Sequence, residues 1–131
     1  LRSSGSPPDA GVDIVLGDTG GELLLLLSLA RVAFMGGSLV PHGGHNVLEA
    51  AVWGVPVLSG PHVFNFGEVS RLLVAAGAME IVHQPQSLGE RCICLLRHPE
   101  RCHRMGAAGQ QVVADNRGAR QRLLQVVAAA L

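Results

Sequence analysis

The sequence predicts an α/β domain in which a Rossmann-like parallel sheet is covered by helices on both faces. Three observations lead to this fold class. Short apolar segments alternate along the chain with longer segments of helical composition. The short segments are nearly continuous apolar runs, which is typical of parallel strands buried on both faces. Glycine-rich turns follow two of these runs, at 17–21 and 36–44, where open parallel sheets bind their ligands.

The individual elements follow from apolar runs and from the Gly and Pro residues that end them. Segment 1–11 is rich in Ser, Gly and Pro, and we expect a loop or the start of a fragment there. The remaining residues, 12–131, form the expected domain. Its expected elements are strand 12–16, helix 23–30, strand 32–35, helix 46–53, strand 55–58, helix 65–76, strand 79–82, helix 87–97, a helix from Pro99 that breaks at 116–118, and a last helix to about Ala130.

Composition narrows the classes of function. The chain of 131 residues is 48% hydrophobic and 15% charged, which suits a folded core better than disorder. Its net charge is zero and it has no Tyr, so no nucleic-acid-binding surface is indicated. The apolar run 23–30 is shorter than the roughly 20 residues of a membrane-spanning helix. Three cysteines, an odd number, favour reduced thiols in the cytosol over a disulfide framework.

The main candidate site is the stretch 36–49, in which four glycines lie between an expected strand and an expected helix. A strand, a glycine-rich loop and a helix start, in that order, direct backbone N–H groups at an anion. Gly43 and Gly44 would let the backbone approach a phosphate, and Glu49 would accept protons from ribose hydroxyls.

A structural alternative explains part of the same stretch. Asn46 and Glu49 have the spacing of a capping box, in which the two residues only begin a helix. The spacing recurs at 65–68 and 87–90, which supports this alternative. A cap alone, however, needs none of the four glycines.

The turn 18–22, Asp-Thr-Gly-Gly-Glu, is a second candidate that would flank the same ligand. Its simpler interpretation is a strand-to-helix turn in which Asp18 or Thr19 caps the helix. The histidines and cysteines do not indicate a metal site. His42 and His45 have an HxxH spacing, but in an expected loop and without a third ligand at helical spacing. Cys92 and Cys94 are two residues apart on an expected helix and therefore point to different faces of it.

Four stretches of the chain resemble the 3-deoxy-D-manno-octulosonic acid (Kdo) transferases. Three of them are GGSLVPHGGHNVLEAA, GVPVLSGPHVFNFGEV and RMGAAGQQVVADNRGA, and the fourth, VLGDTGGELLLL, resembles that family's strand and DTMGEL turn. The resemblance runs from about Val12 to the end of the chain. Two departures stand out: Gly20 replaces a usual Met, which would loosen one wall of the pocket, and Ala50 with Ala51 replaces a frequent Pro-Ala.

The resemblance implies a GT-B glycosyltransferase, in which two Rossmann-like lobes face a cleft. This chain resembles the later, incomplete part of the C-terminal lobe. The implied reaction transfers Kdo from CMP-Kdo to a lipid A precursor, without a metal or other cofactor, in the lipopolysaccharide biosynthesis of Gram-negative bacteria. The implied location is the cytoplasmic face of the inner membrane, with membrane contact that is peripheral or made through a segment without counterpart here.

The resemblance also implies roles for individual residues. Phosphate and ribose contacts come from the glycine loop and its helix, and the 18–22 turn closes the pocket. The implied nucleotide-sugar-binding residues are Gly21, Glu22, Gly43, Gly44, His45, Asn46 and Glu49. The acceptor lobe and the catalytic base have no counterpart in this chain, so we expect no catalytic residue here and an inactive isolated fragment. Two alternatives stay open: a lobe for a UDP-sugar, as in the MurG-like transferases, and a nucleotide-binding module without catalysis.

Overall fold

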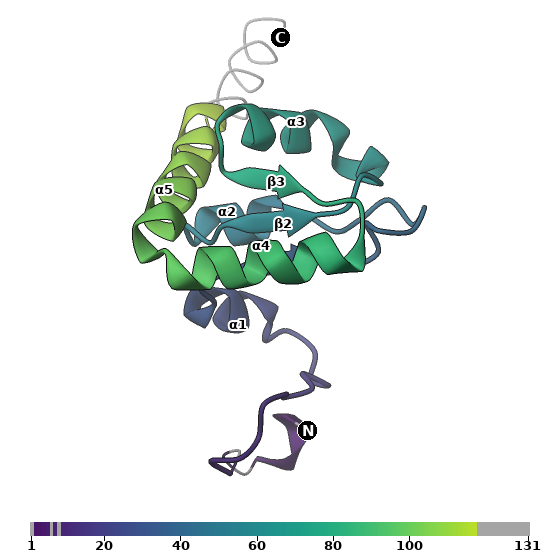
Figure 1. Cartoon of the computed structure of the whole chain (residues 1–131), viewed down its shortest axis with the longest axis vertical. Helices are drawn as coiled ribbons and strands as arrows, with labels where there is room; N and C mark the ends of the chain where they lie inside the picture. The colour runs from purple at the N-terminus through teal and green to yellow at the C-terminus, as the bar shows by residue number, and fades with distance from the viewer. Residues whose placement is uncertain (1, 6, 8, 118–131) are drawn as a thin grey trace, which may run out of the picture.

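The computed structural model describes residues 2–5, 7 and 9–117 of the chain. Its centre is a sheet of parallel strands in the order β1–β2–β3, of which β2 and β3 are labelled in Figure 1. The strands are β1 (Ala33–Met35), β2 (Val57–Ser59) and β3 (Met79–Ile81). The helices are α1 (Leu23–Leu29), α2 (Leu48–Val52), α3 (Gly67–Ala75), α4 (Pro85–Arg97) and α5 (Pro99–Asn116), with two 3₁₀ helices, η1 (Arg2–Ser4) and η2 (Phe64–Phe66).

Both faces of the sheet are covered by helices, because successive strand residues point to opposite faces. Ala33, Val57 and Met79 are aligned across the strands and lie in one core with residues of α1, α2 and α3. Leu58, in the next row, is buried in a second core with Leu95 of α4 and with residues of α5. In Figure 1, α4 crosses in front of the strands and α2 lies behind them. The predicted fold class is therefore confirmed.

Glycines end two helices and direct the chain into the next strand. Gly77 follows α3 with a φ of 74°, and Gly54 follows α2 with a φ of 68°, a left-handed conformation that glycine adopts without strain. In each case the following residue, Ala78 or Val55, donates its N–H to a carbonyl inside the helix. This is the Schellman pattern of helix termination, and it places β2 and β3 directly after their helices.

The side chain of Glu80 joins β3 to two helices on the α4 face of the sheet. Its Oε2 accepts from Arg91 Nε of α4 at 2.7 Å, and its Oε1 accepts from Arg101 Nη2 of α5 at 2.9 Å. All three side chains are between about a quarter and a third exposed. This ion-paired network fixes α4 and α5 against the sheet.

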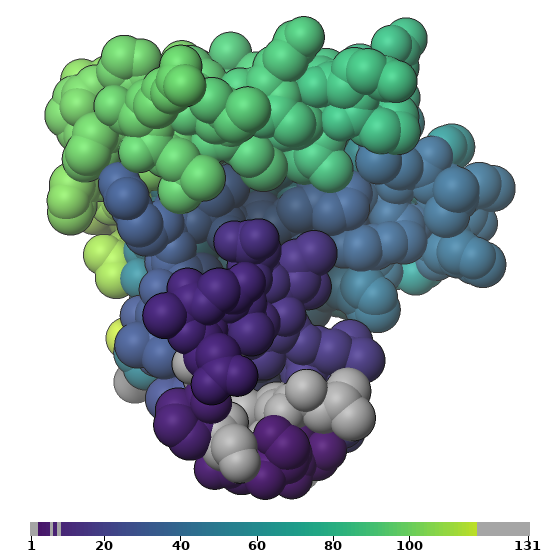
Figure 2. Space-filling model, turned by 60° about the horizontal axis from the view of Figure 1, so that its bottom comes forward, coloured from purple at the N-terminus to yellow at the C-terminus, as the bar shows by residue number. Residues whose placement is uncertain are grey.

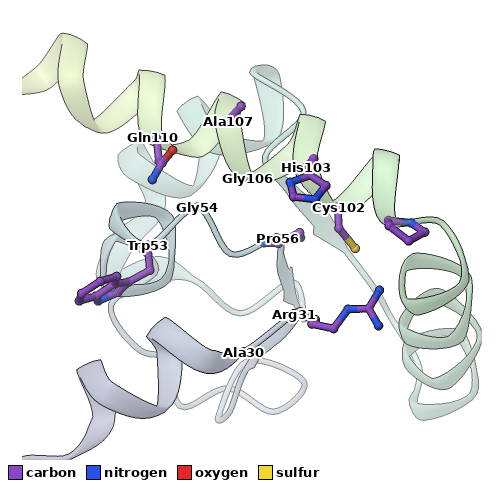
Figure 3. A pocket seen from close by; sticks show the side chains of 11 residues that line it. Ala30, Arg31, Trp53, Gly54, Pro56, Cys102, His103, Gly106, Ala107 and Gln110 are labelled. Atoms are coloured by element: carbon purple, nitrogen blue, oxygen red, sulfur yellow. The ribbon is translucent and has the colours of Figure 1, made fainter.

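The helix α5 packs closely against the end of α2. A Cβ atom added to Gly106 would lie 1.9 Å from the carbonyl oxygen of Gly54, so only glycine allows this approach. Gln110 Nε2 donates to the carbonyl oxygen of Val52 at 3.3 Å, one turn further along α5. Figure 3 shows Gly54, Gly106 and Gln110 together at this contact.

The predicted strand 12–16 is wrong, because these residues form no strand in the structure. Val12, Ile14, Val15 and Leu16 are all exposed, and Ile14 is 86% exposed. An apolar run becomes a strand only where a neighbour supplies ladder hydrogen bonds and a core covers its side chains. Neither is present around 12–16 among the described residues. The N-terminal part of the chain extends away from the sheet in Figure 1, and its purple atoms lie at the front in Figure 2, which brings this end toward the viewer.

Helix boundaries also differ from the prediction. The helix predicted at 87–97 begins at Pro85, because Gln84 precedes it and the Ser87 hydroxyl accepts the Gln84 N–H at 3.3 Å. Pro85 and Pro99 both begin helices, where their missing N–H carries no cost. The last predicted helix, to about Ala130, lies outside the described residues. None of the helices that the structure describes is long and apolar enough to cross a membrane.

Candidate nucleotide site

The loops that follow β1 and β2 meet at the carboxyl edge of the sheet. The first loop contains the glycine pair at 43–44, and the second leads into η2. Asn65 of η2 donates from Nδ2 to the carbonyl oxygen of His42 at 3.4 Å. The two loops therefore form one surface, at the edge where parallel sheets bind ligands.

Gly43 and Gly44 must both be glycine. Their φ values are 90° and 70°, which other residues adopt only with strain. A Cβ atom at Gly43 would also lie 2.6 Å from the ring of Phe64 and 2.3 Å from the amide nitrogen of Asn65. The backbone at the glycine pair thus packs tightly against η2, with Gly43 buried and Gly44 half-buried.

Backbone donors are available at this loop. Gly44 donates a long hydrogen bond of 3.4 Å to the carbonyl oxygen of Gly37. The N–H groups of Gly43, His45 and Asn46 have no acceptor among the described residues. Backbone N–H groups without an acceptor on a glycine-containing loop suit an anion such as a phosphate. Because α2 has only five residues, its dipole would attract an anion less strongly than that of the longer helix expected at 46–53. The hydrogen-bond donors for an anion are therefore those of the loop.

Asn46 both begins α2 and orients Glu49. Its Oδ1 accepts the N–H of Leu48 at 3.1 Å, and its Nδ2 donates to Glu49 Oε1 at 3.3 Å. The helix begins at Leu48 with Val47 at the N-cap position, and Asn46, one residue earlier, accepts an N–H of the first turn through its side chain. Asn46 and Glu49 are both half-buried, so the carboxylate is held in place and still accessible.

The capping-box alternative is not realised here. The N-cap residue is Val47 and not Asn46, and Glu49 bonds to the side-chain amide of Asn46 and not to a backbone N–H. The segments 65–68 and 87–90 have the same spacing, but neither forms a capping box between its first and fourth residues. Asn65 bonds to His42, and Ser87 bonds to Gln84. Spacing alone therefore does not account for Glu49.

A cavity of about 470 Å³ opens beside these residues. Gly36, His45, Asn46 and Glu49 line it on the loop side. Its other walls are apolar side chains of α1 and β1 and the short link between them: Leu23, Leu26, Leu27, Ala30, Val32, Ala33, Phe34 and Met35. The structure thus brings His45, Asn46 and Glu49 together around one cavity. Gly43 and Gly44 precede them on the same loop but do not line the cavity.

The turn 18–22 is less clearly part of the site. Gly21 has a φ of 82°, and the hydroxyl of Thr19 donates to the carboxylate of Glu22. Leu23, the residue after Glu22, lines the cavity, whereas Gly21 and Glu22 do not. Their role at the ligand stays a prediction.

The predicted cap of α1 is wrong. The residue at the N-cap position is Glu22, which makes no side-chain capping bond. Asp18 instead accepts hydrogen bonds from the backbone N–H of Ser3 at 2.8 Å and from its hydroxyl. These bonds lower the pKa of Asp18, since they favour the ionised carboxylate.

The other ligand-bearing side chains are dispersed. No group of three His, Cys, Asp or Glu side chains in the described part of the chain is arranged to hold a metal ion. The three cysteines are free. Cys102 is buried and its thiol lies 3.1 Å from the carbonyl oxygen of Leu95, and burial raises the pKa of Cys92.

A separate cavity of about 380 Å³ lies at the amino ends of β1 and β2 (Figure 3). Arg31, Trp53, His103 and Gln110 are among the residues that line it. None of the predicted site residues does. The two cavities share Ala30 in their walls, but of these two it is the one beside α1 and β1 that reaches the residues of the glycine loop.

Ser38 belongs to the carboxyl-edge site and is not among the residues that the sequence indicates. It is fully buried and its hydroxyl accepts the N–H of Gly60 from the second loop at 2.7 Å. In the sequence, Ser38 is distinguished only by being a polar residue that directly follows a strand and a glycine pair. Its partner is 22 residues away, which no local pattern reveals.

Comparison with known proteins gives relatives along nearly the whole chain. The 3-deoxy-D-manno-octulosonic acid transferase of Haemophilus influenzae is 42% identical over 127 residues, which are 96% of this chain and 30% of that protein. The enzyme of the same name from Bordetella pertussis is 38% identical, with the same shares of 96% and 30%. This chain thus spans about 30% of the length of these relatives. No family model matches.

A solved structure has the same fold. The C-terminal CMP-Kdo binding domain of WaaA from Acinetobacter baumannii superimposes with a TM-score of 0.81 at 35% sequence identity. The match covers 86% of this chain and 58% of that domain.

Proposed function

This chain belongs to the Kdo transferase family as part of its C-terminal lobe, and we propose that it supplies the CMP-binding half of that enzyme. The reaction would move Kdo from CMP-Kdo to a lipid A precursor in lipopolysaccharide biosynthesis. The observation that carries the proposal is the combination of free N–H groups at Gly43, His45 and Asn46 with an oriented carboxylate at Glu49.

Each part of CMP has a matching group in this proposal. The phosphate accepts hydrogen bonds from the N–H groups of the glycine loop, where Gly43 and Gly44 allow close approach. The ribose hydroxyls donate to Glu49, whose second oxygen is not engaged by Asn46. Gly21 and Glu22 close the pocket from the neighbouring turn, and the position of Leu23 in the cavity wall supports this.

The chemical contribution of these residues is electrostatic. When the glycosidic bond to CMP breaks, negative charge grows on the departing phosphate. N–H dipoles that are already oriented stabilise this charge without reorganising. The residues of this chain bind and orient the donor, and no proton transfer is assigned to them.

The remaining parts of the reaction belong to the parent protein. The lipid A precursor would bind the facing N-terminal lobe, which would also supply the base. The parent would act at the cytoplasmic face of the inner membrane, with this lobe in peripheral contact at most. We therefore expect no turnover by this chain alone, and measurable transfer of Kdo by it would contradict this division of roles.

Isothermal titration of the 131-residue chain with CMP and with UDP tests the assignment. We expect CMP to bind more tightly than UDP. A clear preference for UDP would instead support a lobe for UDP-sugars of the MurG-like kind. Binding of CMP with no transfer, even when the chain is supplied with an N-terminal lobe from a relative, would support a nucleotide-binding module without catalysis.

A further inference from the structure

We propose that Ser38 is a positioning residue that holds the two loops of the nucleotide site together. The inference rests on the proposed function, because it explains how the N–H groups that face the phosphate are fixed. Ser38 itself is fully buried and touches no ligand in this proposal.

The hydroxyl of Ser38 forms hydrogen bonds at the carboxyl ends of the two adjacent strands β1 and β2. Its oxygen accepts the N–H of Gly60, which follows β2, at 2.7 Å. Its hydrogen is donated to the carbonyl oxygen of Met35, the last residue of β1, at 2.5 Å. A single side chain thus uses its donor and one acceptor site to join the two loops where they leave the sheet.

The backbone of Ser38 adds a second connection. Its carbonyl oxygen accepts the N–H of His62 at 3.0 Å. A Cβ atom at Gly60 would lie 2.2 Å from this carbonyl oxygen, so only glycine allows the approach. The loop after β2 is therefore held to Ser38 at both Gly60 and His62.

This connection reaches the ligand side through η2 and the glycine pair. A Cβ atom at Gly44 would be 3.4 Å from the carbonyl oxygen of His62 and 3.7 Å from Cβ of Ser38. The second loop also brings Asn65 against Gly43. If the two loops separate, the glycine pair loses its support, and the N–H groups of Gly43 and His45 no longer converge on one phosphate.

Other buried serines show that burial alone does not give this role. Ser59 donates only to the carbonyl oxygen of its neighbour Gly60, at 3.1 Å. The hydroxyl of Ser70 in α3 has no partner. Among the buried serines of the described residues, Ser38 is the one that joins two loops.

The test compares CMP affinity in four versions of the full chain: wild type, Ser38→Ala, Ser70→Ala and Leu95→Ala. Loss of the Ser38 hydroxyl leaves a buried N–H unsatisfied and should weaken CMP binding about tenfold. Ser70→Ala should leave affinity unchanged. Leu95→Ala removes a fully buried side chain between α4 and the sheet, so it should destabilise the domain at least as much as Ser38→Ala and retain CMP affinity.

Two further readouts separate positioning from general destabilisation. Cytidine lacks the phosphate, so Ser38→Ala should weaken its binding by less than about twofold. Amide exchange of the Gly60 N–H should accelerate in Ser38→Ala and stay slow in Ser70→Ala. Ser38→Cys, which keeps a similar volume with weaker hydrogen bonds, replaces Ser38→Ala if that variant does not fold.

The outcomes are distinguishable from failure of the proposed function. If wild type binds CMP and Ser38→Ala binds it equally well, the positioning role is refuted. An equal loss for CMP and cytidine would also refute it. If wild type binds no CMP, the proposed function fails, and unchanged exchange of Gly60 in Ser38→Ala would still refute the connection between the loops.

Discussion

The side-chain amide of Asn46 lies 3.3 Å from the carboxylate of Glu49 and donates a hydrogen bond to it. The carbonyl oxygen of the same amide accepts the N–H of Leu48 at 3.1 Å. One residue therefore accepts an N–H of the first turn of α2 and orients the carboxylate that we assign to ribose. The two roles use different atoms, so substitutions can separate them.

Asn46→Asp should retain the bond from the Leu48 N–H and weaken CMP binding. A carboxylate oxygen accepts an N–H at the start of a helix as well as an amide oxygen does, so the free energy of unfolding should change by less than about 1 kcal/mol. The variant replaces the Nδ2 donor by a negative oxygen beside Glu49 and near the phosphate. CMP affinity should fall at least about tenfold, as measured by calorimetry. Unchanged affinity would show that Asn46 acts only as a cap.

Glu49→Ala complements that variant. The side chain lies in the first turn of α2, where an acidic residue stabilises a helix by no more than about 1 kcal/mol. The melting temperature should therefore change little, and CMP affinity should fall markedly. A lower melting temperature with intact CMP binding would favour the structural alternative for Glu49. Exposed Glu90 of α4 offers a matched control, because Glu90→Ala should change neither quantity.

Gly43→Ala should damage both stability and binding. The substitution places a Cβ at a φ of 90° and 2.3 to 2.7 Å from atoms of Asn65 and Phe64, so strain alone should cost about 1–3 kcal/mol. Gly11→Ala is the control, since Gly11 has no atom within 4 Å of an added Cβ and no positive φ. Thermal unfolding and CMP titration of both variants check this. Equal behaviour of the two would contradict the tight packing at Gly43.

Replacing either of two helical glycines by alanine should change the stability of the domain, in opposite directions for the two positions. Gly106→Ala forces α5 away from the carbonyl oxygen of Gly54, 1.9 Å from the added Cβ, and should cost about 1–3 kcal/mol or more. Gly89→Ala lies on the exposed side of α4 with nothing within 4 Å, and should stabilise by about 0.5–1 kcal/mol. Chemical denaturation of both variants gives the two signs directly. A neutral Gly106→Ala would refute the close contact between α5 and Gly54.

Glu80→Gln should destabilise the contact of α4 and α5 with the sheet. The change removes the charge shared by Arg91 and Arg101. Because each arginine is about a third exposed, solvent screening reduces the effect to roughly 1–2 kcal/mol. The loss should shrink in high salt. A denaturation series in low and high salt measures both effects, and a loss independent of salt would argue for packing rather than charge.

The central sheet was predictable because its strands are apolar runs with unambiguous ends. Val57–Ser59 lies between Gly54 and Gly60, and Met79–Ile81 begins two residues after the helix-ending Gly77. The run 12–16 has the same composition, yet it forms no strand. A strand depends on a neighbour and a covering core, and an apolar run in the sequence specifies neither.

The ligand chemistry of the site stays a prediction from local pattern, whereas the contacts that support the site could not be predicted from the sequence. Glycines before Asn46 and Glu49 indicate an anion and a sugar hydroxyl from local pattern alone. The contact of Ser38 with Gly60, by contrast, is a tertiary relationship between two loops. The start of α4 was missed for a local reason, because 87–90 has the spacing of a capping box while Gln84 and Pro85 begin the helix.

The most direct test of the account follows the backbone amides of the 131-residue chain by two-dimensional NMR during titration with CMP. We expect saturable shifts concentrated at Gly43, Gly44, His45 and Asn46, with smaller shifts at equal concentrations of UDP. Shifts that instead cluster around the cavity at Arg31 would contradict the proposed site. The absence of shifts at CMP concentrations of several millimolar would contradict it too, because the binding free energy would then be no more than about 4 kcal/mol.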